Sequence, residues 1–363
     1  MTLPKKKIMY TLIHKNFFFS LWIMIVAGAG IVATLGGVFF LFSQAPEDQS
    51  LVLLNNTSPE TRFEWWLDGH AVSTEQEQYI RPYAVMIDQG MDSGPLVGID
   101  EASVVFEALV EGGVTRLMAL FDPKVSVQKI GPIRSVRPYF VDWAHGFDAV
   151  LAHAGGSPTA LRLIDGLESD HLNEISSDGR YFFRDPQKYS PHNLFIKNTN
   201  IPWEYKKWYT VIDEQGNRPW EWARGVTDGV QGQTVSHITI DFSRTSYTVE
   251  WKQSDGSKKY QRYRGGVLEN TADGKGVFAV NIIVQYVQVG LEDELRLTMK
   301  TIGEGEALIC SVGQCADGIW KRKDRNQPTQ FFVNSSPPSH LVKLLPGSTW
   351  IEAVPEGRTV TIQ

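Results

Sequence analysis

A long uncharged segment near the start of the chain constrains its architecture more than any other feature. Residues 17–42 hold no charged side chain, and only Ser20 and Thr34 interrupt them with polar groups. A helix of this length measures roughly 39 Å, which exceeds the ~30 Å hydrocarbon core of a bilayer. A soluble helix that is apolar all round would need partners on every face, and a cleaved signal peptide has a much shorter apolar region. We therefore expect residues 17–43 to form an uncleaved, single transmembrane anchor.

Charges on the two sides of this segment predict its orientation. Four lysines precede it and two carboxylates follow it, namely Lys5, Lys6, Lys7 and Lys15, then Glu47 and Asp48. Because positive charge stays inside, we expect residues 1–16 to be cytoplasmic and the C-terminal ectodomain to be extracytoplasmic, at the cell membrane. Small residues recur every four positions, so the helix could also form a homodimer. These small residues are Ala29, Ala33 and Gly37.

The remaining chain has the composition of an acidic globular protein. Hydrophobic residues make up 42% of the sequence and charged residues 21%, which is typical of packed domains. The formal net charge is −6, and the first 43 residues hold four lysines and no carboxylate, so the rest of the chain carries −10. A surface this acidic repels phosphate backbones, and we expect no nucleic-acid partner.

Hydrophobic patterns divide the exported residues into three parts. Residues 44–80 contain seven carboxylates and one arginine, which indicates an acidic stalk. Residues 81–225 alternate apolar strand signals (83–87, 103–107, 116–121 and 149–153) with helix signals (136–145 and 159–167), a pattern typical of an α/β domain. Residues 226–363 show successive segments of period two and no long helical pattern. We expect them to form an all-β domain, either a small barrel or a sandwich.

The two cysteines of the chain are close together in a predicted hairpin. Cys310 and Cys315 flank Val312-Gly313, and a two-residue turn at that dipeptide places the two cysteines directly opposite each other. An extracytoplasmic location permits a disulfide, which we favour over two reduced thiols. Two cysteines cannot form a four-thiolate zinc site.

Residues 107–157 hold the densest cluster of polar groups. Three arginines (Arg116, Arg134 and Arg137) come before the strand that ends at His153, and Gly155-Gly156-Ser157-Pro158 follows it. A glycine turn that leads into a helix start presents free N–H groups to an anion, and arginines add bidentate contacts. The sequence therefore predicts an anion site formed by Arg116, Arg134, Arg137, His153, Gly155, Gly156 and Ser157. The alternative is a capped helix beside a salt-bridge network without a ligand.

Catalysis and metal binding remain open alternatives for the same region. Glu107, Glu111 and His153 are the candidate acid–base groups, and His153 with Ser157, or Ser135 alone, could supply a nucleophile. No G-x-S-x-G or S-x-x-K pattern accompanies them. A metal site would need distant residues to converge without any zinc-motif spacing, and we predict none. Those residues are Glu111, His153, Asp185 and His192.

Several ordered motifs resemble the YerB-like lipoprotein family of bacteria, a two-part domain of unknown function (the DUF3048 N- and C-terminal domains). They are Arg81–Asp88, Glu107–Arg116, Ile130–Phe140, His153–Pro158, Pro191–Leu194, Asn281–Gln285, Ile302–Leu308, Gly318–Trp320 and Gly347–Ile351. The resemblance covers roughly residues 66–355 and implies two domains displayed outside a bacterial membrane, without supplying a reaction. Such a lipoprotein carries a lipidated cysteine near its start, whereas this chain has none before Cys310, so we expect the transmembrane helix to replace the lipid.

A looser likeness connects the chain with the LytR–CpsA–Psr phosphotransferases of cell-wall assembly. It consists of a membrane anchor, the strand 117–121 and an arginine loop before a helix. It would imply Mg²⁺ as the only cofactor, with Asp88 or Glu111 as a ligand. Our main hypothesis is an envelope protein that binds a phosphorylated glycan or a carboxylated peptide; the alternatives are such a phosphotransferase and a non-catalytic scaffold.

Overall fold

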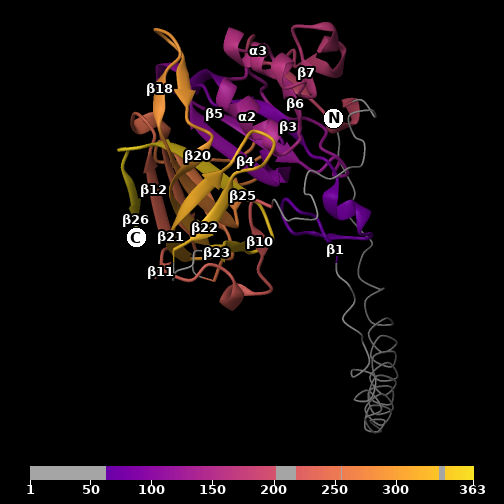
Figure 1. The fold of residues 1–363 in the computed structure, drawn as a ribbon. Helices are drawn as coiled ribbons and strands as arrows, with labels where there is room; N and C mark the ends of the chain where they lie inside the picture. Colours follow the sequence, from indigo (N-terminus) through magenta and orange to yellow (C-terminus); the bar gives the residue numbers. More distant parts are fainter. Residues whose placement is uncertain (1–62, 202–217, 255, 335–339) are drawn as a thin grey trace, which may run out of the picture. The chain divides into compact units, whose positions relative to one another are not determined.

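Strands from both halves of the sequence form one sheet of twelve strands (Figure 1). The structure is a computed structural model that describes residues 63–201, 218–254, 256–334 and 340–363, and residues 62–363 form one compact unit. Along the sheet the order is β23 (His340–Leu341), β22 (Gln330–Val333), β21 (Gln314–Arg322), β20 (Gly303–Ser311), β17 (Asn281–Val287), β25 (Thr349–Pro355), β4 (Val104–Leu109), β5 (Thr115–Phe121), β3 (Tyr83–Asp88), β6 (Val150–His153) and β7 (His171–Asn173). The twelfth strand, β11 (Gln233–Thr234), pairs with β21.

Strand β25, near the end of the chain, joins the two halves of this sheet. It runs parallel to β17 on one side and parallel to β4 on the other. All but the last of its seven residues are buried. The first and second halves of the sequence therefore share a continuous hydrogen-bonded ladder.

Both faces of the central strands are covered, which explains why their sequences read as unbroken apolar runs. Along β3, Ala84 and Met86 belong to one hydrophobic cluster, whereas Val85 and Ile87 belong to another on the opposite face. The first cluster contains α2 (Pro138–Gly146) and α3 (Pro158–Gly166), together with tryptophans of the preceding and middle segments. Those tryptophans are Trp65, Trp66, Trp220 and Trp222.

The second cluster is closed by a smaller sheet of six strands. Its order is β15 (Val267–Leu268), β14 (Tyr260–Arg264), β13 (Thr248–Gln253), β12 (His237–Asp241) and β26 (Val360–Ile362), with β16 (Phe278–Ala279) beside β14. Alternate residues such as Ile238, Ile240, Val249 and Trp251 are fully buried and face the large sheet. The described residues thus form three layers: helices, large sheet and small sheet.

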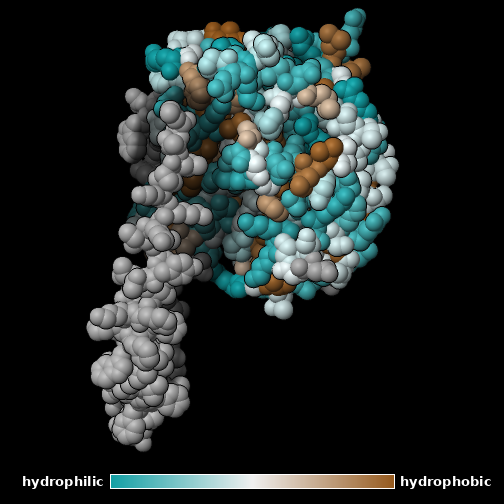
Figure 2. Space-filling model, turned by 180° about the vertical axis from the view of Figure 1, so that it is seen from behind, coloured by the Kyte–Doolittle hydropathy of each residue, from teal (hydrophilic) through white to brown (hydrophobic). Residues whose placement is uncertain are grey.

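Four two-stranded ladders complete the described residues. They are β1 (Phe63–Glu64) with β2 (Ala71–Val72), β8 (Phe182–Arg184) with β9 (Leu194–Ile196), β10 (Glu221–Trp222) with β24 (Lys343–Leu344), and β18 (Val289–Leu291) with β19 (Leu297–Met299). The segment 63–80, which we assigned to the stalk, is packed: the indole N–H groups of Trp65 and Trp66 both donate to the carbonyl of Ile80. On the face shown in Figure 2, hydrophobic side chains are scattered in small patches among polar ones.

The expected fold class is wrong. The described residues contain two α-helices of nine residues each, and they are mostly β, instead of an α/β domain followed by a separate barrel or sandwich. In the first half, β5 runs antiparallel to both β3 and β4, whereas β6 runs parallel to β3 and to β7, so the strand directions are mixed. Sequence periodicity identified the strands but not their direction, which depends on the connections between them.

The described residues contain no helix that is long and apolar enough to cross a membrane. The predicted anchor at residues 17–43, its flanking charges and the homodimer face on it lie outside the described residues.

Candidate functional site

The fold brings Arg116 next to the arginine loop that precedes α2. Arg116 is opposite Asp88 in the β3–β5 ladder, and both side chains lie on the sheet face that packs against the helices. Its guanidinium donates to the carbonyl of Ser135 over 2.7 Å, between Arg134 and Arg137 in sequence. Three arginines that are up to 21 positions apart therefore meet at the start of α2.

Two of these arginines have acidic partners. Arg137 forms a bidentate pair with Glu111, with Nε–Oε1 and Nη2–Oε2 distances of 2.5 and 2.7 Å. The Nε atom of Arg134 lies 3.1 Å from the Oδ2 atom of Asp88. The Nδ1 atom of His192 lies 2.6 Å from the same oxygen. Burial raises the pKa of Glu111, but the hydrogen bonds and charge of Arg137 outweigh it and lower that pKa overall.

Arg116 differs from its two neighbours because it forms no ion pair with a carboxylate of the described residues. The side chain of Arg116 is almost completely buried, and its Nε–H has no hydrogen-bond acceptor among the described residues. Burial, with the nearby charge of Arg137, lowers its pKa to about 10. Three guanidinium groups face two carboxylates, so the cluster carries one uncompensated positive charge before His192 is counted.

The helix start beside these arginines is that of α2, not that of α3. Arg137 is the N-cap residue of α2, and it makes no side-chain hydrogen bond to the first turn. The sequence prediction placed the anion at Gly155–Ser157 instead, where several of the polar groups have internal partners. Gly155 N–H donates to Asn173, Ser157 N–H donates to Val136, and the Ser157 hydroxyl caps α3.

Gly155 and Gly156 have a packing role that requires glycine. Gly155 has a φ of +63°, and a Cβ atom there would lie 2.6 Å from Ile175. A Cβ atom on Gly156 would lie 2.8 Å from the Val136 side chain. The turn therefore holds the arginine loop close to the end of β6.

His153 is fully buried at the end of β6. Its Nδ1–H donates to the carbonyl of Gly155 over 2.8 Å, and its Nε2 atom lies 3.0 Å from Nδ1 of His171. Desolvation lowers the pKa of His153 to about 4. Because the hydrogen bonds of His153 go to Gly155 and His171, this histidine makes no hydrogen bond to Ser157, the nucleophile considered with it.

The other candidate groups lie apart from one another. Glu107 is on the opposite face of the large sheet, where it pairs with Arg262 at 2.5 Å. Asp185 pairs with Lys129 at 2.5 Å, so the four side chains considered for a metal have separate partners. In the described residues, no cluster of three or more His, Cys, Asp or Glu side chains could hold a metal ion.

Sequence reasoning missed the role of His192 and underrated Asp88. We considered His192 as a possible metal ligand, whereas its Nδ1 atom lies 2.6 Å from the Oδ2 atom of Asp88, which is 104 positions away. The charged carboxylate at the end of an apolar strand, Tyr83–Asp88, was the available signal, because such a group is buried only when it has partners.

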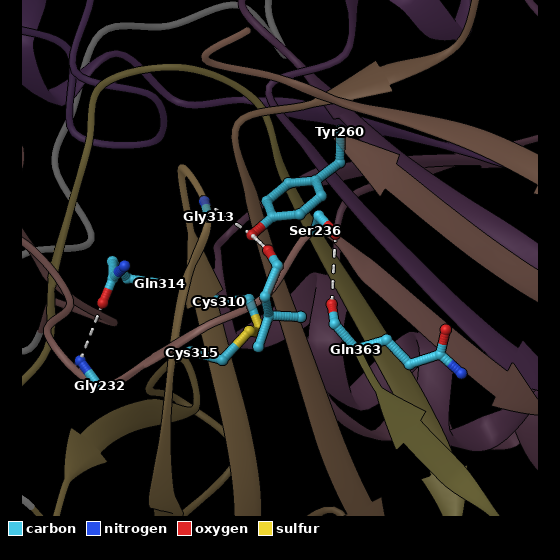
Figure 3. The surroundings of a disulfide bond; sticks show 9 residues. Gly232, Ser236, Tyr260, Cys310, Gly313, Gln314, Cys315 and Gln363 are labelled. Carbon is cyan, nitrogen blue, oxygen red and sulfur yellow. Dashed lines mark hydrogen bonds between the residues drawn. A yellow bond between two sulfur atoms is a disulfide. The ribbon is translucent and has the colours of Figure 1, made fainter. Parts of the chain in front are cut away.

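The predicted hairpin contains the disulfide. Cys310 and Cys315 are bonded and directly opposite each other, with Cα atoms 4.1 Å apart (Figure 3). Val312 and Gly313 both have positive φ, as a tight two-residue turn requires. The hydroxyl of Tyr260 accepts the N–H of Gly313 and ties this turn to the small sheet.

The architecture defines a class of two-sheet proteins with a helix layer, and comparison with known proteins identifies the family. Residues 67–209 match the N-terminal domain, and residues 238–351 the C-terminal domain, of the family described as "protein of unknown function (DUF3048)". The chain belongs to this family. It is 26% identical over 332 residues to "Putative lipoprotein YerB" of Bacillus subtilis, covering 90% of this chain and 95% of that protein. The crystal structure of YerB from Bacillus subtilis matches with a TM-score of 0.69 and 24% identity, over 82% of this chain and 99% of that one.

These comparisons correct the expected localisation. The name of the relative describes a lipoprotein, which is a different anchoring class from a single-pass membrane protein. The topology with a transmembrane signal anchor and a cytoplasmic N-terminus is therefore withdrawn. The apolar segment suggested a span because hydropathy measures length and polarity alone.

Proposed function

We propose that this protein is a cell-envelope protein that binds an anionic ligand at Arg116 and Arg134, beside the first turn of α2. The ligand class is a phosphorylated glycan or a carboxylated peptide, which share a compact anionic group. The lipoprotein name of the relative supports the envelope location.

One observation carries this proposal: the nearly buried guanidinium of Arg116 has an unused Nε–H and no carboxylate partner in the described residues. A buried cation without a counter-ion is costly, and an anion that neutralises it regains that free energy. Phosphate and carboxylate groups match the planar fork of arginine donors.

The surroundings favour an anion that is attached to a larger molecule. Met91 and Tyr189 are 63% and 90% exposed and are therefore available for contact. Both are near the cluster, because Met91 follows Gly90, whose N–H donates to Asp88, and the carbonyl of Tyr189 accepts the N–H of His192. They offer apolar contacts to a sugar ring or to a peptide next to the charged group.

The phosphotransferase alternative is less well supported by these contacts. It needs Asp88 or Glu111 as a Mg²⁺ ligand, yet Asp88 already pairs with Arg134 and His192, and Glu111 pairs with Arg137. The scaffold alternative explains those ion pairs but leaves the uncompensated charge of Arg116 without a purpose.

Calorimetric titration with three probes tests the proposal: inorganic pyrophosphate, glucose 1-phosphate and acetyl-Ala-Ala. We expect saturable binding of at least one probe, weakened about tenfold or more by Arg134→Gln, because a charge-assisted hydrogen bond contributes about 1.5–3 kcal/mol. Arg162→Gln, on the exposed face of α3, is the matched control and should not change the affinity.

The melting temperature separates binding from a scaffold role. Arg134 is partly exposed, so a binding role predicts a small change in melting temperature with Arg134→Gln. A large loss of stability in that variant, together with no binding of any probe to the unmodified protein, would overturn the proposal in favour of the scaffold.

A further inference from the structure

A groove on the opposite side of the large sheet from the arginine cluster has no role in the proposed function. Its cavity measures about 500 Å³ and lies between the β20–β21 hairpin and the C-terminal strand β26. A second cavity of about 380 Å³ shares four lining residues with it and continues it toward the disulfide. The shared residues are Leu308, Asp317, Asn334 and Ile362.

The groove exists because the small sheet ends before it covers the large one. Strand β26 pairs with β12 on one side and with no other strand among the described residues on its other side. Beyond it, the inner face of the β20–β21 hairpin continues uncovered. Glu306 and Leu308 on β20 and Asp317 and Ile319 on β21 share this face, because directly paired residues of antiparallel strands point the same way.

The open edge of β26 presents backbone groups to this groove. Gln363 exchanges two hydrogen bonds with His237, so Thr361, two residues earlier, is the next residue bonded to β12. Hydrogen bonding alternates along an antiparallel pair, which leaves the N–H and C=O groups of Val360 and Ile362 directed away from β12. Val360 and Ile362 both line the cavity.

The charges of the groove specify its occupant. Glu306 and Asp317 are exposed, and neither forms an ion pair with a cation of the described residues. Tyr286 lies beside them, and burial together with the two carboxylate charges raises its pKa. The groove thus presents two unpaired acids beside an apolar strip of Leu308, Ile319 and Ile362. These groups complement an extended chain in which every second side chain, the one that faces the groove, is basic or apolar.

We propose that an extended basic polypeptide segment binds here as an added strand along β26, with its inward side chains over Glu306, Asp317 and Ile319. Such a strand would extend the small sheet from six strands to seven and cover the exposed part of the β20–β21 hairpin. Main-chain hydrogen bonds to Val360 and Ile362 provide affinity, and the two carboxylates select Lys or Arg. The disulfide lies at the end of this hairpin (Figure 3), and Cys315 lines the second part of the groove.

Fluorescence polarisation with labelled peptides tests this proposal on the full-length chain. The probe is Thr-Lys-Thr-Val-Thr-Lys-Thr, which presents its two lysines and its valine on one face when extended. We expect saturable binding that is weakened roughly fivefold by Glu306→Gln with Asp317→Asn, because two partly exposed ion pairs are lost. Asp165→Asn with Glu168→Gln, exposed on and after α3, removes the same charge and should leave the affinity unchanged.

Two further measurements address the backbone contacts. A probe that is N-methylated on its hydrogen-bonding residues should lose binding, and so should Val360→Pro, which removes an N–H directed away from β12. Equal binding of the glutamate analogue Thr-Glu-Thr-Val-Thr-Glu-Thr, or full affinity of the N-methylated probe, would overturn the proposal. Absence of saturable binding of the lysine peptide would also overturn the proposal. If the chain then self-associates, and Val360→Pro abolishes that self-association, the edge of β26 binds a second copy of the chain instead.

Discussion

Glu107 and Glu352 lie side by side on the neighbouring parallel strands β4 and β25, and both are completely buried. Their carboxyl groups face the small sheet, where Trp251 donates its indole N–H to Glu352 over 2.8 Å. Arg262 pairs with Glu107 and Glu269, and its guanidinium lies near the rings of both Trp251 and Trp350. Arg262 forms an ion pair with Glu107 and not with Glu352, so the two adjacent acids cannot both be charged easily and the network should contribute to the pH dependence of stability.

Glu352 should destabilise the fold as the pH rises. Desolvation and the charge of Glu107 raise the pKa of Glu352 well above its usual range. A raised folded-state pKa means that stability is fully present below the unfolded pKa of about 4.3 and is lost as pH rises through the folded value. We expect urea unfolding from pH ~4 to ~9 to show that the free energy of unfolding of Glu352→Gln rises relative to that of the unmodified protein. Within that window the difference should grow by up to about 1.4 kcal/mol per pH unit. Parallel curves, like those expected for the exposed Glu294→Gln control, would contradict this assignment.

Arg262→Met should be strongly destabilising, by about 3–5 kcal/mol, because it leaves Glu107 buried without its cation. Removing the stranded charge as well should recover part of the loss, so Arg262→Met combined with Glu107→Gln should be more stable than Arg262→Met alone. Denaturant titration of the two single variants and the double variant measures this coupling. Strict additivity of the two single effects would show that the pair does not interact.

His153 should make the protein less stable in mild acid. Burial lowers its pKa to about 4, below the unfolded value of about 6.5. Stability is therefore present above pH 6.5 and is lost as the pH falls toward 4, by up to about 3 kcal/mol. His153→Asn, which keeps a donor for Gly155, should flatten this part of the profile. An NMR titration in which the ring of His153 protonates near pH 6.5 would refute the prediction.

Reducing the disulfide should have a modest effect. Cys310 and Cys315 close a loop with a separation of five residues, so the entropy removed from the unfolded chain corresponds to about 2 kcal/mol at most. Replacing both cysteines with alanine should lower the free energy of unfolding by about that amount and leave the hairpin intact. Calorimetry of the variant and of the oxidised protein makes the comparison, and complete unfolding of the variant at 25 °C would be inconsistent with it.

Local structure could be predicted from the sequence where apolar residues recur regularly. The strands at 83–87 and 116–121 and the helices at 136–145 and 159–167 occur within a few residues of their expected bounds. The position of β25 between β17 and β4 could not be predicted, because strand order depends on contacts between residues more than 200 positions apart. The same limit hid the pair of His192 with Asp88.

The candidate site was predictable in composition but not in geometry. The arginines at 116, 134 and 137 do come together, since β5 and the loop before α2 are neighbours in the fold. In the glycine turn that we expected to contribute to the anion site, the N–H groups of Gly155 and Ser157 donate to Asn173 and Val136. A glycine and serine pattern before a helix predicts a cap equally well with or without a ligand, so sequence alone could not decide between the two.

The location of a bound anion tests the central claim most directly. A crystal structure of the protein soaked with inorganic pyrophosphate should show a phosphate group within hydrogen-bond distance of the Arg116 Nε atom and of the Arg134 guanidinium, beside the first turn of α2. Density for the anion only on surface lysines, or an unoccupied Arg116 at a pyrophosphate concentration that saturates the protein in solution, would contradict the account.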